Sequence, residues 1–337
     1  MEALVWLGPG SMRVEQHDVP APAHGEVLIR VGHAGICGSE LEGYAGHSAI
    51  RLPPLVMGHE FAGHVEALGD GVTETLAIGD PVTVNPLTYC GDCYYCKAGR
   101  NHLCPTRTLI GAHRQGAFAG YVAVPAATVV MLPPGLGTSA GALCEPAAVA
   151  TRVAVLASVA SGDPVLVIGA GPIGLLTLQA FLLEGAGPVY VVDRNPARSD
   201  MAAALGGIPL AAGENLGREV RARCDDRGVA VAVDAVGSTT TRRACIEATR
   251  SGGRIIFSGL HEEAVTAPAV ELIRRELTLQ GVYAYGPTEF ATALSRIAAG
   301  TMHLGAWTQE APLADGVAWF PRLIDGRVSV SKVLLQP

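Results

Sequence analysis

A glycine-rich turn in the middle of the chain constrains the fold more than any other feature. Gly169 to Gly174 read G-A-G-P-I-G, which is the pattern G-x-G-x-x-G. The turn follows the apolar run Val165–Ile168 and precedes a helical pattern over Leu175–Leu183. In this context the glycines allow a tight turn and a close approach of a pyrophosphate, and the helix N-terminus supplies amide donors. We therefore predict a dinucleotide-binding unit with Gly169, Gly171 and Gly174 in contact with the cofactor.

The segments after this turn predict a doubly wound α/β domain. Continuous apolar runs are typical of parallel strands that are buried on both faces. Here such runs alternate with helical stretches, which indicates a parallel sheet covered by helices. After about residue 288 the pattern changes to helix (289–299), loop, helix and strand (328–335). The apolar runs that we expect to be strands are Val189–Val192, Val229–Val233, Ile255–Phe257 and Leu277–Leu279.

The chain before about residue 145 has a different texture. It is rich in Gly and Pro and carries short segments such as Val27–Val31 and Asp80–Val84. Short strands separated by turn residues predict an all-β or barrel-like domain. The 337 residues are therefore expected to form about two domains.

Asp193 bears on the choice of cofactor. It ends the second predicted strand, 19 residues after Gly174. An acidic side chain at this place accepts hydrogen bonds from both ribose hydroxyls of NAD and repels the 2′-phosphate of NADP. Arg194 and Arg198 lie next to it, and either could pair with a 2′-phosphate. The residues favour NAD and leave NADP as the alternative.

Four cysteines form a compact metal-ligand motif. Cys90, Cys93, Cys96 and Cys104 have the spacing C-x2-C-x2-C-x7-C. Four thiolates surround a zinc ion at about 2.3 Å each and leave no open position, so the predicted site is structural. An iron–sulfur cluster is the rival, because Pro105 follows the last cysteine, but ferredoxins have three residues before that cysteine rather than seven. A reduced set without metal is the remaining alternative.

A second group of ligand types is spread along the chain. Cys37, the pair His59-Glu60 and the pair Cys144-Glu145 supply thiolate, imidazole and carboxylate groups. A lone buried Cys or His is usually a packing residue. Jointly, in a chain with a nucleotide turn, they fit a zinc site that keeps one position open for substrate.

Composition excludes several classes of protein. Hydrophobic residues make up 49% of the chain and charged residues 16%, which excludes a disordered chain. The net charge of −7 and the lack of a Lys/Arg run argue against nucleic-acid binding. The uncharged stretch 164–183 has the length of a membrane span, but the Pro and Gly residues in its first half favour a strand, turn and helix. We expect no membrane association, a cytoplasmic protein, and eight cysteines without disulfides.

Together, these motifs resemble the zinc-dependent medium-chain alcohol dehydrogenases, in particular the sorbitol (polyol) and threonine dehydrogenase branch. The resemblance extends over essentially the whole chain. It implies a GroES-like, β-rich catalytic domain (residues 1–147 and 288–337) and a Rossmann dinucleotide-binding domain (148–287). Its further landmarks are Gly35–Ser39, Met57–Glu60, Val72–Asp80, Gly116–Ala119, Glu145-Pro146 and Gly326-Arg327-Val328.

The resemblance also implies roles for individual residues. Cys37, His59 and Glu60 would face a catalytic zinc, and Glu145 would be a ligand directly or through water. Ser39 would accept the substrate proton. Where many family members carry Asp after this Ser and His at the fifth position after Cys37, this chain has Glu40 and Glu42. Glu42 is either a proton relay or substrate contact, or an exposed side chain. The expected cofactor contacts are Pro172, Ile173, Asp193, Arg198, Ser258, Gly259, Leu260, Val282 and Tyr283.

The expected activity is hydride transfer between a secondary alcohol (a polyol, cyclitol or amino alcohol) and NAD, which gives a ketone. Two zinc ions per chain are expected, one catalytic and one structural. A ketone reductase, a redox-neutral enzyme that retains its NAD, and a non-catalytic relative are the alternatives. The expected partners are the small alcohol or ketone and further copies of the chain, in a homodimer or homotetramer.

Overall fold

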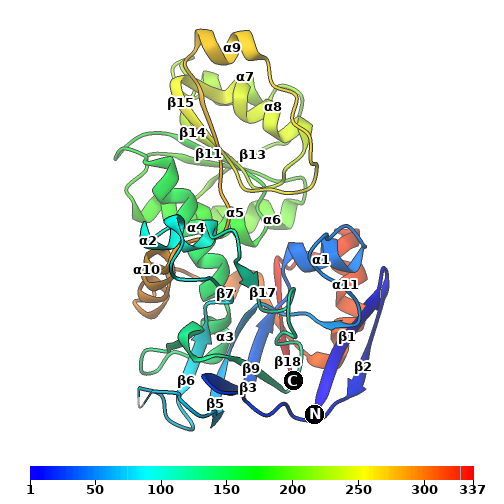
Figure 1. Cartoon of the computed structure of the whole chain (residues 1–337). Coiled ribbons are helices and arrows are strands. Elements are labelled where there is room, and N and C mark those ends of the chain that lie inside the picture. Colours follow the sequence, from blue (N-terminus) through cyan, green and yellow to red (C-terminus); the bar gives the residue numbers. More distant parts are fainter. Residues whose placement is uncertain (74, 327) are drawn as a thin grey trace. The chain divides into compact units, whose positions relative to one another are not determined.

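The computed structural model describes residues 1–73, 75–326 and 328–337, and these fall into two compact units. The first unit comprises residues 1–145, 286–298 and 307–337, and the second comprises residues 146–285 and 299–306 (Figure 1). The predicted boundaries were 147 and 288, and the prediction placed 299–306 in the first domain. Glu74 and Arg327, which belong to two of the predicted landmarks, lie outside the described residues.

The second unit is built on a six-stranded parallel sheet of order β13-β12-β11-β14-β15-β16. The sequence order reverses direction between β11 and β14, which is the switch point where doubly wound sheets bind ligands. The predicted doubly wound fold is confirmed. β13 was not predicted, because its three residues include a proline and only one of them is buried. The strands are β11 (Val165–Ile168), β12 (Val189–Val192), β13 (Ile208–Leu210), β14 (Val229–Asp234), β15 (Thr249–Phe257) and β16 (Thr278–Gly281).

Helices cover both faces of this sheet. α5 (Pro172–Leu183) and α6 (Pro196–Ala204) lie on one face, and α7 (Leu216–Ala222) and α8 (Thr239–Ala248) lie on the other (Figure 1). Residues 174–181 of α5 are all buried, which explains why this helix is apolar on every side. None of the described helices is long and apolar enough to cross a membrane. α4 (Cys144–Ala157) and α9 (Ala269–Arg274) complete the helices around this unit.

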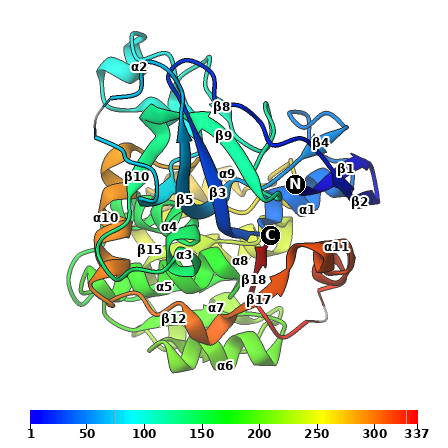
Figure 2. The same ribbon diagram turned by 90° about the horizontal axis from the view of Figure 1, so that it is seen from below.

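The first unit is mainly β-structure, as expected for a GroES-like domain. Its largest sheet has the order β10-β6-β5-β3-β18-β17, with β9 paired to β3 (Figure 2). A three-stranded sheet of order β2-β1-β4 and the hairpin β7-β8 complete it. The strands are β1 (Glu2–Gly8), β2 (Ser11–Gln16), β3 (Glu26–Gly35), β4 (Leu55–Val56), β5 (Glu60–Leu68), β6 (Pro81–Val84), β7 (Leu87–Thr88), β8 (Thr108–Leu109), β9 (Tyr121–Pro125), β10 (Val129–Met131), β17 (Thr308–Pro312) and β18 (Lys332–Gln336).

The C-terminal segment contributes α10 (Pro287–Ala298), α11 (Gly316–Asp325) and the last two strands. The prediction of a strand over 328–335 was wrong at its start, since β18 begins at Lys332. Its parallel partner β17 begins at Thr308, which pairs with Lys332, so no ladder exists before this point. β17 was missed because its polar, largely exposed sequence lacks an apolar run.

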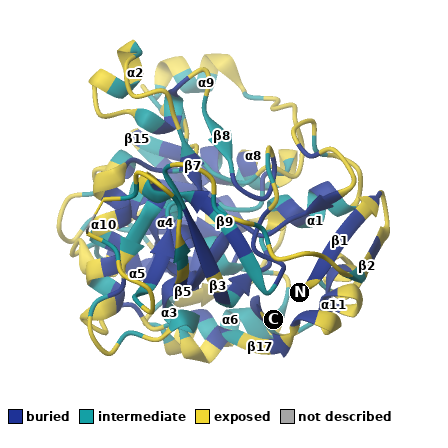
Figure 3. Ribbon diagram, turned by 60° about the horizontal axis from the view of Figure 1, so that its bottom comes forward, coloured by how far each residue is buried: buried dark blue, intermediate teal, exposed yellow. Residues whose placement is uncertain are grey.

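The core of the first unit supports the strands that carry the candidate ligands. Buried strands and helix faces are dark blue in Figure 3. Phe61 on β5, Phe118 and Phe320 on α11 are fully buried, and the rings of Phe118 and Phe320 meet edge to face at 6.0 Å. Burial of each such side chain contributes about 1.5–3 kcal/mol. This packing fixes the start of β5.

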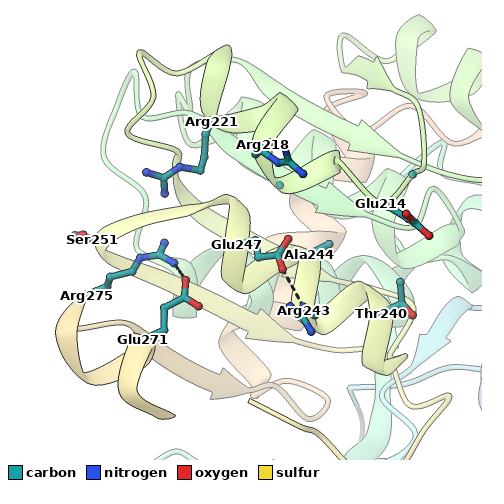
Figure 4. Close-up of a pocket in the computed structure, with 12 residues that line it drawn as sticks. Glu214, Arg218, Arg221, Thr240, Arg243, Ala244, Glu247, Ser251, Glu271 and Arg275 are labelled. Carbon is teal, nitrogen blue, oxygen red and sulfur yellow. Dashed lines mark hydrogen bonds and ion pairs between the residues drawn. The ribbon is translucent and has the colours of Figure 1, made fainter. Parts of the chain in front are cut away.

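A charged cavity of about 800 Å³ lies in the second unit (Figure 4). Side chains of α7, α8 and α9 line it, and none of the predicted site residues is among them. Arg243 bonds Glu247 across 2.9 Å, and Arg275 bonds Glu271. Arg218 and Arg221, which also line it, bond the Asn215 side chain and the Asp226 carbonyl.

Candidate metal centres and cofactor turn

Three predicted ligands meet in the first unit. The ligand atoms of Cys37, His59 and Glu60 all lie within 4.8 Å of one another. Cys37 is the N-cap of α1 (Gly38–Tyr44), whereas Glu60 is the first residue of β5. Thiolate, imidazole and carboxylate are zinc ligands, and three protein ligands leave a fourth position free. This donor set therefore fits a catalytic rather than a structural zinc.

Glu40 contacts two of these three candidate ligands, Cys37 and His59. Its carboxylate is completely buried and accepts a hydrogen bond from the backbone of Gly58 at 2.8 Å and of Cys37 at 3.0 Å. The same oxygen that meets Gly58 lies 2.8 Å from Nδ1 of His59. A carboxylate only accepts, so Nδ1 carries the proton and Nε2 remains available to a metal. The sequence analysis noted Glu40 as a departure from the family pattern and missed this orienting role.

The charges in this site shift two pKa values. Burial raises the pKa of Glu40, but His59, Arg51 and the Cys37 amide more than offset this and lower it. Burial likewise opposes a charged His59, while Glu40 and Cys37 raise the pKa of His59 well above its usual value. A metal that binds His59 must therefore displace a proton that these neighbours retain.

Lys332 is a buried cation that the sequence analysis did not place in the site. Its side chain is 2% exposed, and Nζ donates to both oxygens of Glu60 at 2.8 and 2.6 Å and to the Ile36 carbonyl at 2.9 Å. Burial lowers the pKa of Lys332, yet Glu60 and Cys37 raise it overall. The charge of Glu60 is thus already paired with a buried cation. The sequence signal for this buried cation was a lysine directly before the apolar run V-L-L.

Ser39 lies beside the candidate ligands. Its Oγ is 3.5 Å from Sγ of Cys37. The guanidinium of Arg51, a residue that is 4% exposed, donates to Oγ and to the carbonyl oxygen of Ser39 at 3.2 and 3.1 Å. The hydroxyl is therefore held in place next to the candidate ligand Cys37.

The two other predicted catalytic carboxylates are placed differently. Glu145, in the first turn of α4, is 8% exposed and is not part of the three-residue group. Its neighbour Cys144 lies 3.7 Å from the Phe290 carbonyl, and burial raises the pKa of its thiol, as expected for a packing residue. The side chain of Glu42 is 42% exposed and contacts Nδ1 of His47 at 3.1 Å.

The four-cysteine motif forms a second cluster in the first unit. All four sulfur atoms lie within 4.8 Å of one another. Cys93 is the N-cap of the short helix α2 (Tyr94–Lys97), and Cys96 lies within that helix. Cys104 follows a helical turn at 101–103. A backbone hydrogen bond with Cys90 lowers the pKa of the Cys104 thiol to about 6. Four converging thiols, one of them readily ionised, fit a closed tetrahedral zinc site.

The glycine-rich turn has the packing that the motif predicts. A Cβ on Gly174 would lie 1.7 Å from the carbonyl oxygen of Gly169, so the third glycine lets the helix pack on the strand. Gly169 itself has φ +103°. Nothing lies within 4 Å of a Cβ built on Gly171, which leaves that side open to a ligand. Pro172 is the first residue of α5, where a missing amide proton has no cost.

Asp193 is tied to this turn at the end of β12. Oδ2 accepts from the amide of Ala170 and Oδ1 from the amide of Asn195, both at 2.8 Å. Arg198 lies on α6, which Asn195 caps, and its Nε has no hydrogen-bond partner among the described residues. The acidic group therefore lies beside the open face of the glycine turn.

The remaining predicted cofactor contacts lie at the carboxyl ends of the next strands. Ser258, Gly259 and Leu260 follow β15, and Val282 and Tyr283 follow β16. A Cβ on Gly259 would lie 2.2 Å from the Val236 backbone in the loop after β14, so the two loops pass backbone to backbone. Leu260 and Tyr283 are 76% and 44% exposed.

Comparison with known proteins bears on this arrangement. Residues 23–134 match the family model "Alcohol dehydrogenase GroES-like domain", and residues 172–299 match "Zinc-binding dehydrogenase". Sorbitol dehydrogenase of Bacillus subtilis is 31% identical over 90% of this chain and 88% of its own length. The chain belongs to the zinc-dependent alcohol dehydrogenase family.

Two further relatives agree with this membership. L-threonine 3-dehydrogenase of Pyrococcus horikoshii is 35% identical over 84% of this chain and 82% of its own length. The solved structure of alcohol dehydrogenase TADH from Thermus sp. ATN1 has a TM-score of 0.92 and 32% identity, and covers 100% of this chain and 99% of its own. The resemblance read from the motifs is confirmed, and the protein is an enzyme of this family of zinc-binding dehydrogenases.

Proposed function

We propose that this alcohol dehydrogenase oxidises a secondary alcohol to a ketone with NAD, and that its substrate is a polyol, cyclitol or amino alcohol. The observation that carries the proposal is the group Cys37, His59 and Glu60, with His59 oriented by the buried Glu40. Three donors and one open position suit an ion that activates a substrate oxygen. The similarity to a sorbitol dehydrogenase supports a polyhydroxylated substrate.

The protein's own residues would hold, polarise and deprotonate the substrate hydroxyl. When bound, zinc would act as a Lewis acid that lowers the pKa of that hydroxyl, and NAD would accept the hydride. Glu40 keeps the Nδ1 proton on His59, so that Nε2 is free to bind the ion. Ser39 Oγ accepts the substrate proton through a hydrogen bond, and its own proton passes to water.

The two metal sites would have different tasks. Cys90, Cys93, Cys96 and Cys104 would hold a structural zinc, since four thiolates leave no position for substrate. The protein is thus proposed to carry two zinc ions per chain.

Glu145 is assigned a place outside the direct ligand set. It is not among the donors that lie within 4.8 Å of one another, so we propose that it acts through water. Glu42 is proposed to lie at the edge of the site, where its exposed carboxylate contacts His47 and would meet a polar substrate group.

NAD is the proposed cofactor because of Asp193. Both oxygens of this carboxylate accept hydrogen bonds from backbone amides, which fixes the group at the glycine turn. A negative charge there favours ribose hydroxyls and disfavours a 2′-phosphate. Of Arg194 and Arg198, either of which could reverse this choice, Arg198 lies on the helix that follows.

We also propose that the enzyme is a homodimer or homotetramer. Val270 and Ile273 on α9 are 62% and 75% exposed, which supports contact with another copy. Light scattering of the purified protein tests this: a mass of one chain would contradict it.

The experiment that tests the activity is NADH formation by zinc-quantified protein. The panel contains polyols, aminocyclitols, amino alcohols and simple secondary alcohols, each assayed with NAD and with NADP. We expect turnover of at least one polyhydroxylated substrate with NAD and loss of turnover after chelation. Turnover that survives removal of both zinc ions would refute the proposal. No turnover with fully zinc-loaded protein, together with tightly retained nicotinamide, would point to the redox-neutral alternative.

A further inference from the structure

Arg51 is a buried cation that the proposed mechanism does not yet use. Its side chain is 4% exposed, yet its guanidinium donates only to neutral groups, namely the carbonyl oxygen of Ser39 at 3.1 Å and Oγ of Ser39 at 3.2 Å. Among the described residues Nε has no hydrogen-bond partner and Arg51 makes no direct ion pair, although its charge interacts with the buried carboxylate of Glu40. Burial of a cation has a large desolvation cost. The direct hydrogen bonds that offset this cost at Arg51 both go to Ser39.

The neighbouring helix is shaped to admit this side chain. Gly43 of α1 faces the Arg51 stem, and a Cβ on Gly43 would lie 2.9 Å from Cδ of Arg51. The stem thus occupies the space that a larger residue at position 43 would fill. Two bonds from one guanidinium to one residue then restrain both the backbone and the side chain of Ser39.

We infer that Arg51 is a positioning residue that fixes the Ser39 hydroxyl for proton transfer, an inference that rests on the proposed role of Ser39. Arginine only donates hydrogen bonds, so Oγ must accept from Nη2. The hydroxyl proton of Ser39 then points away from Arg51, and Cys37 Sγ lies 3.5 Å from Oγ on the other side. One lone pair of Oγ remains for the substrate hydroxyl.

This geometry also gives the proton transfer a direction. Arg51 stays protonated at any physiological pH, so a proton that reaches Ser39 does not continue through it. The cation instead favours negative charge on Oγ while the Ser39 proton leaves for water. Without Arg51 the Ser39 hydroxyl rotates freely, and only part of its population faces the open position.

The test is a double-mutant cycle between Arg51 and Ser39. Arg51→Gln is expected to lower kcat about tenfold and leave the KM for NAD unchanged, and Arg51→Lys is expected to lose less. Ser39→Ala is expected to lose about 100-fold, as is typical of a group that transfers a proton. In the Ser39→Ala background, Arg51→Gln should change kcat less than twofold, because the hydroxyl that it positions is gone. Arg13→Gln on the exposed part of β2 is the control for loss of an arginine.

A measurement without turnover accompanies the cycle. The zinc content of each variant and its urea unfolding are measured in parallel, and the unfolding equilibrium constants of the four proteins should show a coupling of about threefold or more. Gly43→Ala displaces the Arg51 stem without removing the charge, and it should reproduce part of the kcat loss. This variant serves if Arg51→Gln does not fold.

The outcomes separate the inference from the proposed function. If Ser39→Ala lowers kcat while Arg51→Gln keeps the wild-type kcat, the inference is overturned and the zinc mechanism stays intact. If Ser39→Ala keeps the wild-type kcat, the proton relay through Ser39 is refuted. If the effects of the two changes on the unfolding equilibrium are then also additive, the positioning contact is refuted as well. Loss of zinc in Arg51→Gln would show a structural role and overturn the inference.

Discussion

Glu40→Gln removes one negative charge from the completely buried carboxylate that orients His59, while keeping its shape. The carboxylate accepts three hydrogen bonds, of 2.8, 2.8 and 3.0 Å. The amide oxygen of Gln retains the bonds to Gly58 and His59, but its NH2 group then faces the amide of Cys37, donor against donor. A hydrogen bond to a charged group contributes about 1.5–3 kcal/mol and a neutral bond about 0.5–1.5 kcal/mol.

These values give the size of the expected effect. One bond is lost and two are weakened, while relief of a buried charge offsets part of the loss. We expect the unfolding free energy to fall by about 2–4 kcal/mol. Loss of a group that orients a ligand histidine lowers metal affinity by about 10–100-fold.

The assays are zinc competition against a chromophoric chelator and urea unfolding. Glu42→Gln is the matched control, because it makes the same change two residues further along the same helix at a side chain that is 42% exposed. Its unfolding free energy should change by less than about 0.5 kcal/mol. If Glu40→Gln bound zinc and resisted urea as the wild type does, the orienting role of Glu40 would be refuted.

The same variant gives a pH signature. The pKa of His59 is raised in the folded protein, so in metal-free protein its protonation contributes stability below its unfolded pKa of about 6.5, and that contribution is lost as pH rises through the folded pKa. Zinc affinity should rise about tenfold or more per pH unit over the same window, because binding displaces the proton of His59. In Glu40→Gln the folded-state pKa of His59 should lie closer to its unfolded value, because the neighbouring negative charge is gone. The pH range over which stability and zinc affinity change should therefore become narrower and end nearer to neutral pH.

Three further changes test other parts of the site. Lys332→Met leaves Glu60 buried without its cation, so metal-free protein should lose about 3–5 kcal/mol of unfolding free energy, and zinc-loaded protein clearly less; equal losses would contradict the pairing. Cys93→Ser should reduce the zinc content from two ions to one and lower the melting temperature, and unchanged zinc content would contradict the closed four-thiolate site. Asp193→Ala should lower kcat/KM for NAD about tenfold or more and reduce the preference for NAD over NADP, since a charged acceptor for the ribose is lost. An unchanged ratio of kcat/KM for the two cofactors would show that Asp193 does not select between them.

Much of the fold could be predicted because local sequence and tertiary structure agree there. The run Val165–Ile168, the glycine turn and α5 form a strand, turn and helix whose signals are contained in about 20 residues. β13 and β17 escaped prediction because both are short and largely exposed, so their burial does not impose an apolar pattern. Each depends on one parallel partner, β12 for β13 and β18 for β17, and a local apolar pattern does not reveal that pairing.

The candidate site was predictable as a set of ligands but not as an electrostatic network. Cys37, His59 and Glu60 carry ligand chemistry that the sequence displays. The residues behind them do not, since Lys332 reaches Glu60 from 272 positions further along the chain. Arg51 belongs to no ligand motif, and its burial follows from how the segment before Met57 folds over α1.

The most direct test of the central claim compares wild-type protein with His59→Ala for zinc content, NAD binding and NADH formation in one preparation. We predict two zinc ions and turnover for the wild type. The variant should retain one zinc ion and its affinity for NAD, with turnover lost. A variant that still formed NADH at the wild-type rate would contradict the proposal that Cys37, His59 and Glu60 hold the catalytic ion.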